Sequence, residues 1–217
     1  MILEAVTVCI NYGDYLRVGL AHNASQLNKL VVVTTKDDDE TRSVISDCGL
    51  GNVVECLVES GGAPFNKGKF INTGLRMLDR SDWLLHLDSD IVFPVGLRKI
   101  ILGGVRRRDI IYGIHRTCTS DPQDVERFLS GQSIVGKIAF RDSPKPVGYF
   151  QLWHATSNPM RKEPWYPDSH ESVTRSDVEF TRKFPSCAFI RNAMCLHLGV
   201  PVVNWRGRVS GRWGGGK

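Results

Sequence analysis

The sequence predicts an α/β fold, with an open, mostly parallel (mixed) sheet and helices on both of its faces. Three observations support this prediction. Short, β-rich apolar runs alternate with helical patterns through residues 5–114. The apolar runs are nearly continuous, as expected for strands that are buried on both faces. The intervening stretches place leucine and isoleucine at helical spacing, which gives each helix one apolar face.

The first strand and helix are predicted from residues 5–10 and the pattern after them. The strand ends at the turn-prone residues 11–14, and leucines then recur on one helical face. Residues 29–35 read as the second buried strand. Asp37, with Glu40 three residues later, resembles a capping box that opens the next helix.

Three more strands and a capped helix are predicted before residue 115. Residues 52–58 form the third strand, and Asn66 can cap a helix with Ile71 on its apolar face. Residues 83–87 form the fourth strand and residues 109–114 the fifth. In a parallel sheet of this kind, ligands bind at the carboxyl ends of the strands.

The second half of the chain is less regular. Residues 115–147 are polar and show no clear pattern. Residues 145–155 read as a strand pair or an edge element, and residues 160–172, with two prolines, as a loop. Ser176, with Glu179 three residues later, predicts a second capping box and a short helix.

The bulk composition indicates one soluble globular domain over residues 1–217. Hydrophobic residues make up 41% and charged residues 24% of the chain. No apolar run approaches the length of a membrane span, and the first residues read as a strand, not a signal peptide. The six cysteines are scattered without metal-binding spacing, which favours reduced thiols and a cytoplasmic location.

The net charge of +5 is unevenly distributed. Residues 106–108 are three consecutive arginines. Residues 204–217 contain three arginines, a lysine and two tryptophans but no acid. Such a tail either is a solubilising terminus or contacts the phosphates of a nucleotide or nucleic acid.

Two acids follow the fourth strand directly. Asp88 and Asp90 point to the same side if the strand continues through them. Converging carboxylates repel each other unless a cation lies between them, and Mg²⁺ or Mn²⁺ suits hard oxygen ligands. Acids that cap a polar turn would explain the same spacing.

Two histidines lie on apolar strands. His197 is either a hydrogen-bonded core residue or a metal ligand, and Mn²⁺ accepts a mixture of imidazole and carboxylates. His86 shares the strand parity of Asp88 but precedes it within the sheet. We therefore expect His86 to be a core or supporting residue.

Several motifs, in order, resemble those of the GT-A-fold nucleotide-sugar glycosyltransferases. The first strand ends in Asn11-Tyr12, and the second ends in VTTKDDDET. The stretch FNKGKFINTGL, residues 65–75, resembles the FN(R/K)xKxxNxG helix of galactosyltransferase-like members. LLHLDSDIVF matches the apolar strand and DxD of the family, and CLHLGVPVVNW, residues 195–205, resembles its late HxxG…W element.

The resemblance implies a GT-A (Rossmann-like) glycosyltransferase fold, a donor site and a metal site. Residues 1–114 would bind the nucleotide sugar, with UDP-sugar expected, and residues 115–217 the acceptor. The metal, Mn²⁺ or Mg²⁺, would be held by Asp88, Asp90 and His197. The donor contacts would be Asn11, Tyr12, Thr35, Asp37, Lys69, Asp88, Ser89 and Arg206. The chain lacks the Lys-Pro-Trp of glycogenin-like members, so the cation facing the diphosphate would be Arg206 or Arg208.

Asp177 occupies the position of the acid that opens a late helix in inverting members of the family. It would deprotonate the acceptor hydroxyl, with Glu171 and Asp168 as the next choices. An acid in the first turn of a helix is also explained by the helix dipole. Four aromatic residues could either stack on a sugar or base or fill the core: Trp153, His154, Trp165 and Tyr166.

Two alternatives of other classes remain. A nucleotidyltransferase acting on sugar phosphates shares the α/β layout but opens with a glycine-rich basic loop, whereas this chain has NYGDYL. A non-catalytic module that binds nucleic acid or glycan through the basic tail would not need the acids and His197 to converge. The acceptor of a transferase could be a glycan, a small molecule, a protein or a modified DNA base.

Overall fold

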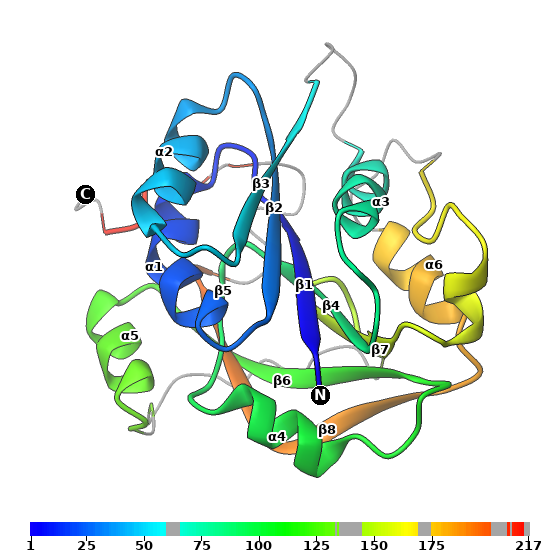
Figure 1. The fold of residues 1–217 in the computed structure, drawn as a ribbon. Coiled ribbons are helices and arrows are strands. Elements are labelled where there is room, and N and C mark those ends of the chain that lie inside the picture. Colours follow the sequence, from blue (N-terminus) through cyan, green and yellow to red (C-terminus); the bar gives the residue numbers. More distant parts are fainter. Residues whose placement is uncertain are drawn as a thin grey trace.

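The protein folds around one curled sheet with helices on both faces (Figure 1). The computed structural model describes residues 1–59, 66–132, 134, 145–168, 175–200, 208 and 210–214. The strands follow the spatial order β3-β2-β1-β4-β7-β6-β8-β5. Their bounds are β1 Leu3–Val8, β2 Lys29–Thr35, β3 Val53–Val58, β4 Trp83–Asp88, β5 Ile91–Val92, β6 Ile111–Thr119, β7 Phe150–His154 and β8 Cys187–Leu198.

The first four of these strands in space form the parallel half of the sheet. β3, β2, β1 and β4 pair in parallel, which confirms the pattern expected from alternating strands and helices. β7 then pairs antiparallel with both β4 and β6, β8 runs parallel to β6, and β5 pairs antiparallel with β8. The sheet is therefore mixed, as predicted.

Each face of the sheet is covered by its own helices. Leu16 and Leu20 of α1 and Leu97 of α4 pack on one face, while Ile71 of α3 and Phe180 of α6 pack on the other. Figure 1 shows α1 and α2 on the opposite side of the sheet from α3 and α6. The bounds are α1 Gly13–Ala24, α2 Asp39–Cys48, α3 Lys67–Arg76, α4 Leu97–Gly104, α5 Pro122–Leu129, α6 Ser176–Arg182 and a 3-10 helix, η1, Asn158–Arg161.

The structure corrects two predictions for the second half of the chain. β7 is not an edge element but lies between β4 and β6 in the middle of the sheet. Its side chains from Phe150 to His154 are all buried, the polar Gln151 and His154 included, as a central strand requires. The polar stretch after β6 contains α5, which begins with Asp121 as its cap and a proline in its first turn.

Helix capping agrees with the sequence at one site and differs at two. Asn66 caps α3, because its side chain accepts a hydrogen bond from the Lys69 amide. The cap of α2 is Asp38, not Asp37, so the predicted capping box is shifted by one residue. Ser176 is the first helical residue of α6 and makes no side-chain cap, so the second capping box is also wrong.

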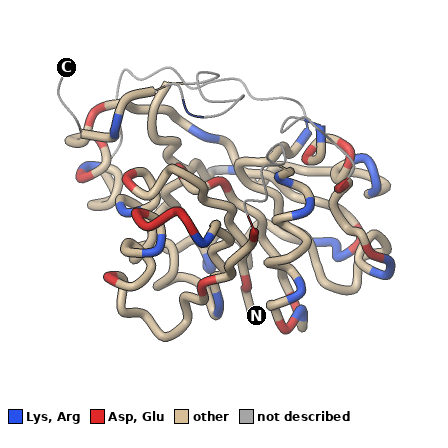
Figure 2. Tube along the Cα trace, turned by 90° about the horizontal axis from the view of Figure 1, so that it is seen from above, with Lys and Arg blue, Asp and Glu red and all other residues tan. Residues whose placement is uncertain are grey.

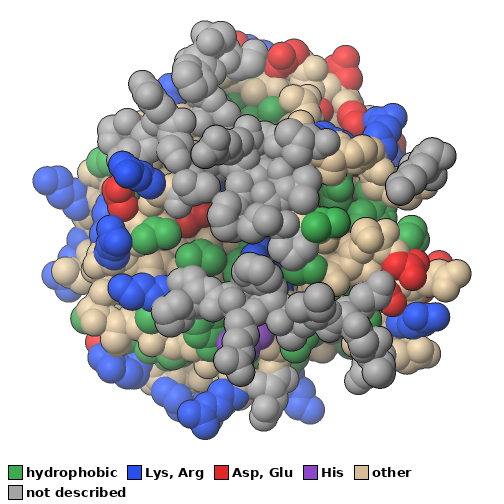
Figure 3. Space-filling model, turned by 180° about the vertical axis from the view of Figure 1, so that it is seen from behind, with side chains coloured by type: hydrophobic (Ala, Val, Ile, Leu, Met, Phe, Trp, Pro, Cys, Tyr) green, Lys and Arg blue, Asp and Glu red, His purple; other side chains and the backbone are tan. Residues whose placement is uncertain are grey.

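Charged residues of both signs are interspersed along the described chain, with one continuous acidic run at residues 37–40 (Figure 2). On the face seen in Figure 3, basic side chains gather at the left and lower edges and acidic ones mainly at the upper right. All six cysteines lie in the described part of the chain, and none of them is in a disulfide. None of the helices described is long and apolar enough to span a bilayer.

Candidate functional site

The carboxyl ends of the parallel strands bring the predicted donor-site residues to one edge of the sheet. β1 ends at Val8, three positions before Asn11, β2 ends at Thr35 and β4 ends at Asp88. Because β1 lies between β2 and β4, these three positions share that edge. Asp90 follows in the short turn before β5, with Ser89 between the two acids.

A buried lysine joins two of the predicted site residues. The ammonium of Lys67, the first residue of α3, donates a hydrogen bond of 2.6 Å to Oδ1 of Asp88. Its contact with Oδ2 of Asp177, the second residue of α6, is 3.4 Å. The Lys67 side chain is only 10% exposed, so the ion pairs lie largely away from water. Residues 110 positions apart in the sequence therefore form one charged cluster.

The pKa values of the two acids in this cluster are shifted in opposite directions. Burial alone would raise the pKa of the Asp88 carboxyl, but the adjacent Lys67 ammonium holds it below its usual value. At Asp177 burial is the stronger effect, and it raises the pKa of the carboxyl to about 6 despite Lys67. Burial would lower the pKa of Lys67, but Asp177 and Asp88 together raise it. Lys67 is therefore a permanent cation of this site.

Asp90 and His197 form the second pair of the site. Oδ2 of Asp90 lies 3.4 Å from Nε2 of His197, which comes from the end of β8. Oδ1 of Asp90 and Nδ1 of His197 are buried and have no hydrogen-bond partner among the described residues. Such unpaired polar atoms are rare in folded proteins and suggest a site that accepts a ligand. Burial, with the charge of Asp88, raises the pKa of the Asp90 carboxyl, although His197 opposes this.

The pair formed by Asp90 and His197 fits a divalent cation in part. Two ligands about 2.1 Å from one ion lie about 3 Å apart, close to the observed separation. Asp88 presents Oδ1 to Lys67, and the described residues contain no cluster of three acid, histidine or cysteine ligands poised around one point. A complete three-residue metal site therefore requires Asp88, Asp90 and His197 to rearrange, and it stays a prediction.

A buried network of hydrogen bonds packs against the charged cluster. Gln151 of β7 donates through Nε2 to the carbonyl of Asp177 at 3.0 Å and to Oγ1 of Thr181 at 2.7 Å. Its Oε1 accepts a hydrogen bond from the Tyr166 hydroxyl at 2.7 Å. His86 completes this layer and is fully buried, as expected from its position within the strand before Asp88. Burial and the nearby Lys67 lower the pKa of His86 to about 3, so its ring is neutral.

The turn after β1 is held by an acid that the sequence pattern did not single out. Oδ2 of Asp38 accepts hydrogen bonds from the amide of Asn11 at 2.7 Å and from the hydroxyl of Thr41 at 2.7 Å. Asn11 has a φ of 60°, a left-handed conformation that asparagine tolerates better than most residues. Tyr12 is half-buried, and burial followed by the charge of Asp90 raises its pKa. Its hydroxyl therefore belongs to the same electrostatic environment as the acids.

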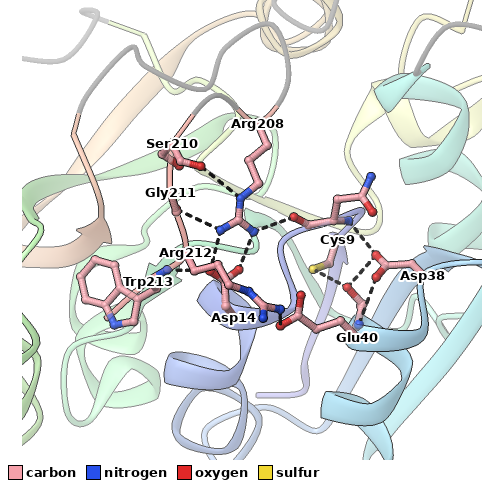
Figure 4. A network of polar contacts seen from close by, with 11 residues as sticks. Cys9, Asp14, Asp38, Glu40, Arg208, Ser210, Gly211, Arg212 and Trp213 are labelled. Atoms are coloured by element: carbon pink, nitrogen blue, oxygen red, sulfur yellow. Dashed lines mark hydrogen bonds and ion pairs between the residues drawn. The ribbon is translucent and has the colours of Figure 1, made fainter. Parts of the chain in front are cut away.

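The described C-terminal residues dock onto this turn (Figure 4). The guanidinium of Arg208 bonds to both carboxylate oxygens of Asp14, in the first turn of α1, and to the carbonyl of Asn11. It also lies over the rings of Tyr12 and Tyr15. Of the two arginines expected to face a diphosphate, Arg208 is thus already paired, and Arg206 lies outside the described residues.

The other residues predicted to contact the donor or acceptor differ in their exposure. Thr35 is buried at the end of β2, whereas Asp37 in the following turn is exposed. Lys69 is exposed on the first turn of α3, so the lysine at the centre of the cluster is Lys67. Asp168, an alternative base, is exposed, and Glu171 is not among the described residues.

The four aromatic residues of the second half belong to the core and its support. Trp153 and Tyr166 are fully buried and pack with Phe180, and Trp165 is 2% exposed. His154 is hydrogen-bonded to Asp82. Their burial favours the core interpretation over stacking on a sugar or base.

Sequence reasoning missed Lys67, Asp38 and Gly148 as site residues. A Cβ atom at Gly148 would lie 1.8 Å from Oδ2 of Asp177 and 2.9 Å from the Lys67 ammonium, so glycine is required there. The FNKGK motif contains both lysines, and helical phase from the Asn66 cap could have assigned Lys67 to the buried side. No local signal marks Gly148.

Comparisons with known proteins identify the fold. No family model and no curated sequence matches the chain. A mannosyltransferase from Pyrobaculum calidifontis, solved with GDP-Man and Mn²⁺, superposes with a TM-score of 0.60 at 14% identity, over 94% of this chain and 58% of its own. Glucosyl-3-phosphoglycerate synthase from Mycobacterium tuberculosis, solved with Mn²⁺, UDP-Glc and phosphoglyceric acid, gives 0.58 at 12%, over 92% and 72%.

A third structure belongs to another class of transferase. The 4-diphosphocytidyl-2C-methyl-D-erythritol synthase from Anaerococcus prevotii gives a TM-score of 0.51 at 14% identity, over 89% of this chain and 87% of its own. The chain spans little more than half of the mannosyltransferase. These likenesses show that the chain has the α/β fold of nucleotide-sugar glycosyltransferases, which confirms the GT-A fold predicted from the sequence.

Proposed function

We propose that this chain is a metal-dependent glycosyltransferase that moves a sugar from a UDP-sugar to an acceptor hydroxyl with inversion. One observation carries the proposal. A buried carboxylate with a pKa of about 6, Asp177, lies in one charged cluster with Asp88 at the carboxyl edge of the sheet. The fold is shared with structures solved with GDP-Man or UDP-Glc and Mn²⁺.

The donor would bind along the edge formed by β1, β2 and β4, within residues 1–114. The turn at Asn11 and Tyr12 is fixed by Asp38 and lies in the same electrostatic environment as the acids. Residues 115–217, which supply Asp177, would bind the acceptor. The full set proposed to contact the donor is Asn11, Tyr12, Thr35, Asp37, Lys69, Asp88, Ser89 and Arg206.

Asp90 and His197, joined by Asp88, would hold Mn²⁺ or Mg²⁺. Their unpartnered buried atoms and close approach support this assignment. When bound, such an ion neutralises the negative charge that develops on the departing diphosphate. The excess of acids over Lys67 in this part of the site leaves net negative charge for a cation to balance.

Asp177 would accept the proton from the acceptor hydroxyl. A general base works best with a pKa near the operating pH, and a value of about 6 leaves it mostly deprotonated at neutral pH. Its position in the first turn of α6 would favour the charged form, but burial outweighs this effect. Oδ1 of Asp177 is buried and has no hydrogen-bond partner within the described part of the chain, which supports its role as proton acceptor.

The proposal is tested by measuring thermal stabilisation by UDP-, GDP- and dTDP-sugars with and without Mn²⁺, followed by detection of sugar transfer. We expect a manganese-dependent rise in melting temperature with a UDP-sugar. Asp90→Asn should remove the dependence, and Asp177→Asn should retain donor binding but lose transfer. The proposal is wrong if no nucleotide sugar stabilises the protein under either condition.

A nucleotidyltransferase is the second candidate, because the chain also superposes on the synthase from Anaerococcus prevotii. The turn after β1 argues against a nucleotidyltransferase, because its sequence, NYGDYL, is not a glycine-rich basic loop. Gly13 is explained by packing, since a Cβ there would lie 2.6 Å from the Glu40 side chain. The two activities differ in their products: a nucleotidyltransferase releases pyrophosphate from a nucleoside triphosphate, whereas a glycosyltransferase releases a nucleoside diphosphate.

A further inference from the structure

Lys67 has an unusual position for a lysine on an otherwise amphipathic helix. Its ammonium is buried between carboxylates from two other elements, Asp88 at the end of β4 and Asp177 at the start of α6. A buried charge is tolerated only when it is paired, so all three side chains depend on one another. The FNKGK motif contains Lys67 but does not predict its contact with Asp177.

The surrounding backbone fixes the ammonium in place. Asn66 caps α3, which makes Lys67 its first residue, and Gly68 packs so closely that a Cβ would lie 1.9 Å from the carbonyl oxygen of Pro167. Gly148 leaves the space in which the ammonium and the Asp177 carboxylate meet. The packing of α3, β4 and α6, with the space left by Gly68 and Gly148, therefore fixes the position of the Lys67 ammonium. A lysine exposed to solvent would not need such close packing.

We propose that Lys67 is a positioning residue that holds Asp177 in its deprotonated, inward-facing state and links it to Asp88. This inference rests on the proposed function for its consequence in catalysis. Without the ammonium, Asp88 and Asp177 would be two buried carboxylates that repel each other. The base would then keep its proton up to a higher pH. A lysine on the donor side thereby controls the group that activates the acceptor.

The electrostatic surroundings of Asp177 single out Lys67 among the described elements. Asp88 faces Asp177 from β4, Tyr166 from the segment after η1, and the Gly148 backbone amide from the segment before β7, while His86 lies 4.0 Å from Asp88. Burial keeps the Tyr166 hydroxyl protonated by raising its pKa. Within this described set, the ammonium is the cation facing the base.

The test follows the titration of the Asp177 carboxyl by ¹³C NMR in the ligand-free protein. We expect a midpoint near 6 in the unmodified chain. Lys67→Met, which keeps the length of the side chain, should raise the midpoint by about 1–3 pH units. Lys67→Arg should restore most of the original value. Lys69→Met on the same helical turn is the matched control, because Lys69 is exposed, and it should leave the midpoint unchanged.

Asp88→Asn is a second variant that does not depend on Lys67→Met folding. Asp88→Asn removes the negative charge that repels the Asp177 carboxylate, and the Lys67 ammonium then pairs with Asp177 alone. The titration midpoint of Asp177 should therefore fall. Folding of every variant is checked from its amide spectrum. The inference is overturned if folded Lys67→Met keeps the original midpoint, or if Asp88→Asn raises it.

The titration separates this inference from the proposed function, because it uses neither donor nor acceptor. If no sugar transfer exists but the midpoints move as expected, Lys67 still controls Asp177 and only the glycosyltransferase proposal fails. If transfer is found, the acid limb of kcat/KM in Lys67→Met should move to higher pH by the shift that NMR records. An active enzyme whose limb does not move would overturn the role of Lys67 alone.

Discussion

Arg208 and Asp14, 194 positions apart in the sequence, form a two-pronged ion pair in which both carboxylate oxygens accept a hydrogen bond, at 2.7 and 2.6 Å. The Trp213 amide also donates to Asp14. The carboxylate thus anchors the described C-terminal residues to the start of α1, beside the turn at Asn11 (Figure 4). Both side chains are largely buried, at 19% and 11% exposure, so water screens the pair weakly.

Removing Arg208 should destabilise the fold measurably. We expect Arg208→Ala to lower the free energy of unfolding by about 1–3 kcal/mol, because a paired, charged hydrogen bond is lost and Asp14 is left without its cation. Urea denaturation followed by circular dichroism measures the change. Arg212→Ala is the matched control, since Arg212 pairs with Glu40 at the surface and should change stability little.

The effect of Arg208→Ala should depend on pH in a defined direction. Burial would raise the pKa of Asp14, but Arg208 and the Trp213 amide hold it below its usual value. The stabilisation is therefore present above the pKa of an unfolded aspartate and is lost as pH falls through the lower folded value. The difference between the two proteins should shrink in acid. A difference that stays constant down to acid unfolding would contradict this assignment.

Asp90 should be needed for metal-dependent activity. We expect Asp90→Asn to lower kcat/KM by roughly 10²–10⁴, since a catalytic metal contributes several kcal/mol of charge stabilisation. Chelation by EDTA should have a similar effect on the unmodified protein and be reversed by Mn²⁺. Asp47→Asn, at an exposed ion pair on α2, is the control. Full transfer activity in EDTA would rule out the metal role of Asp90 and His197.

The parts of the fold set by local patterns could be predicted from the sequence. The strand ending at Asp88 and the α3 cap at Asn66 depend on residues a few positions apart, and both are observed. The place of β7 depends on which strands it meets. Its apolar residues fit an edge or a centre equally well, so the sequence could not place it between β4 and β6.

The sequence pattern singled out the acids of the candidate site but not the buried cation beside them. Asp88, Asp90 and His197 come from recognisable strand ends, and the fold brings them to one region. Lys67 and Lys69 differ by only two positions, and their side chains separate into buried and exposed because of where α6 and Gly148 pack. That choice is made by tertiary contacts, which a single sequence does not encode locally.

Transfer should require a deprotonated group with a pKa near 6. Because burial raises the pKa of Asp177 to about 6, kcat/KM should rise with pH below that value and level off above it. Asp177→Asn should abolish this limb and lower kcat strongly, while donor affinity changes little. Initial rates from pH 5 to 8 with saturating metal measure both effects. An unchanged limb in the residual activity of Asp177→Asn would assign it to another group.

The same substitution should not weaken the fold at neutral pH. The carboxyl of Asp177 has a higher pKa in the folded chain, so its contribution to stability is fully present below the unfolded pKa and is lost as pH rises through about 6. Asparagine mimics the protonated form. We therefore expect Asp177→Asn to match the unmodified protein near pH 4 and to equal or exceed its unfolding free energy by up to about 2 kcal/mol at pH 8. Urea titrations of both proteins at pH 4 and pH 8 measure the unfolding free energies. A clearly lower unfolding free energy of Asp177→Asn at pH 8 would contradict the prediction.

A single methyl group at Gly148 should separate the base from its lysine. Its Cβ would lie 1.8 Å from Oδ2 of Asp177 and 2.9 Å from the Lys67 ammonium, so one of these groups must move. We expect Gly148→Ala to lower the unfolding free energy by about 1–3 kcal/mol through overpacking and to lower kcat more than donor affinity. Gly103→Ala in α4 is the control, because a Cβ there meets no atom within 4 Å, and alanine should stabilise the helix slightly. If Gly148→Ala keeps full kcat, the contact between Lys67 and Asp177 has no part in turnover.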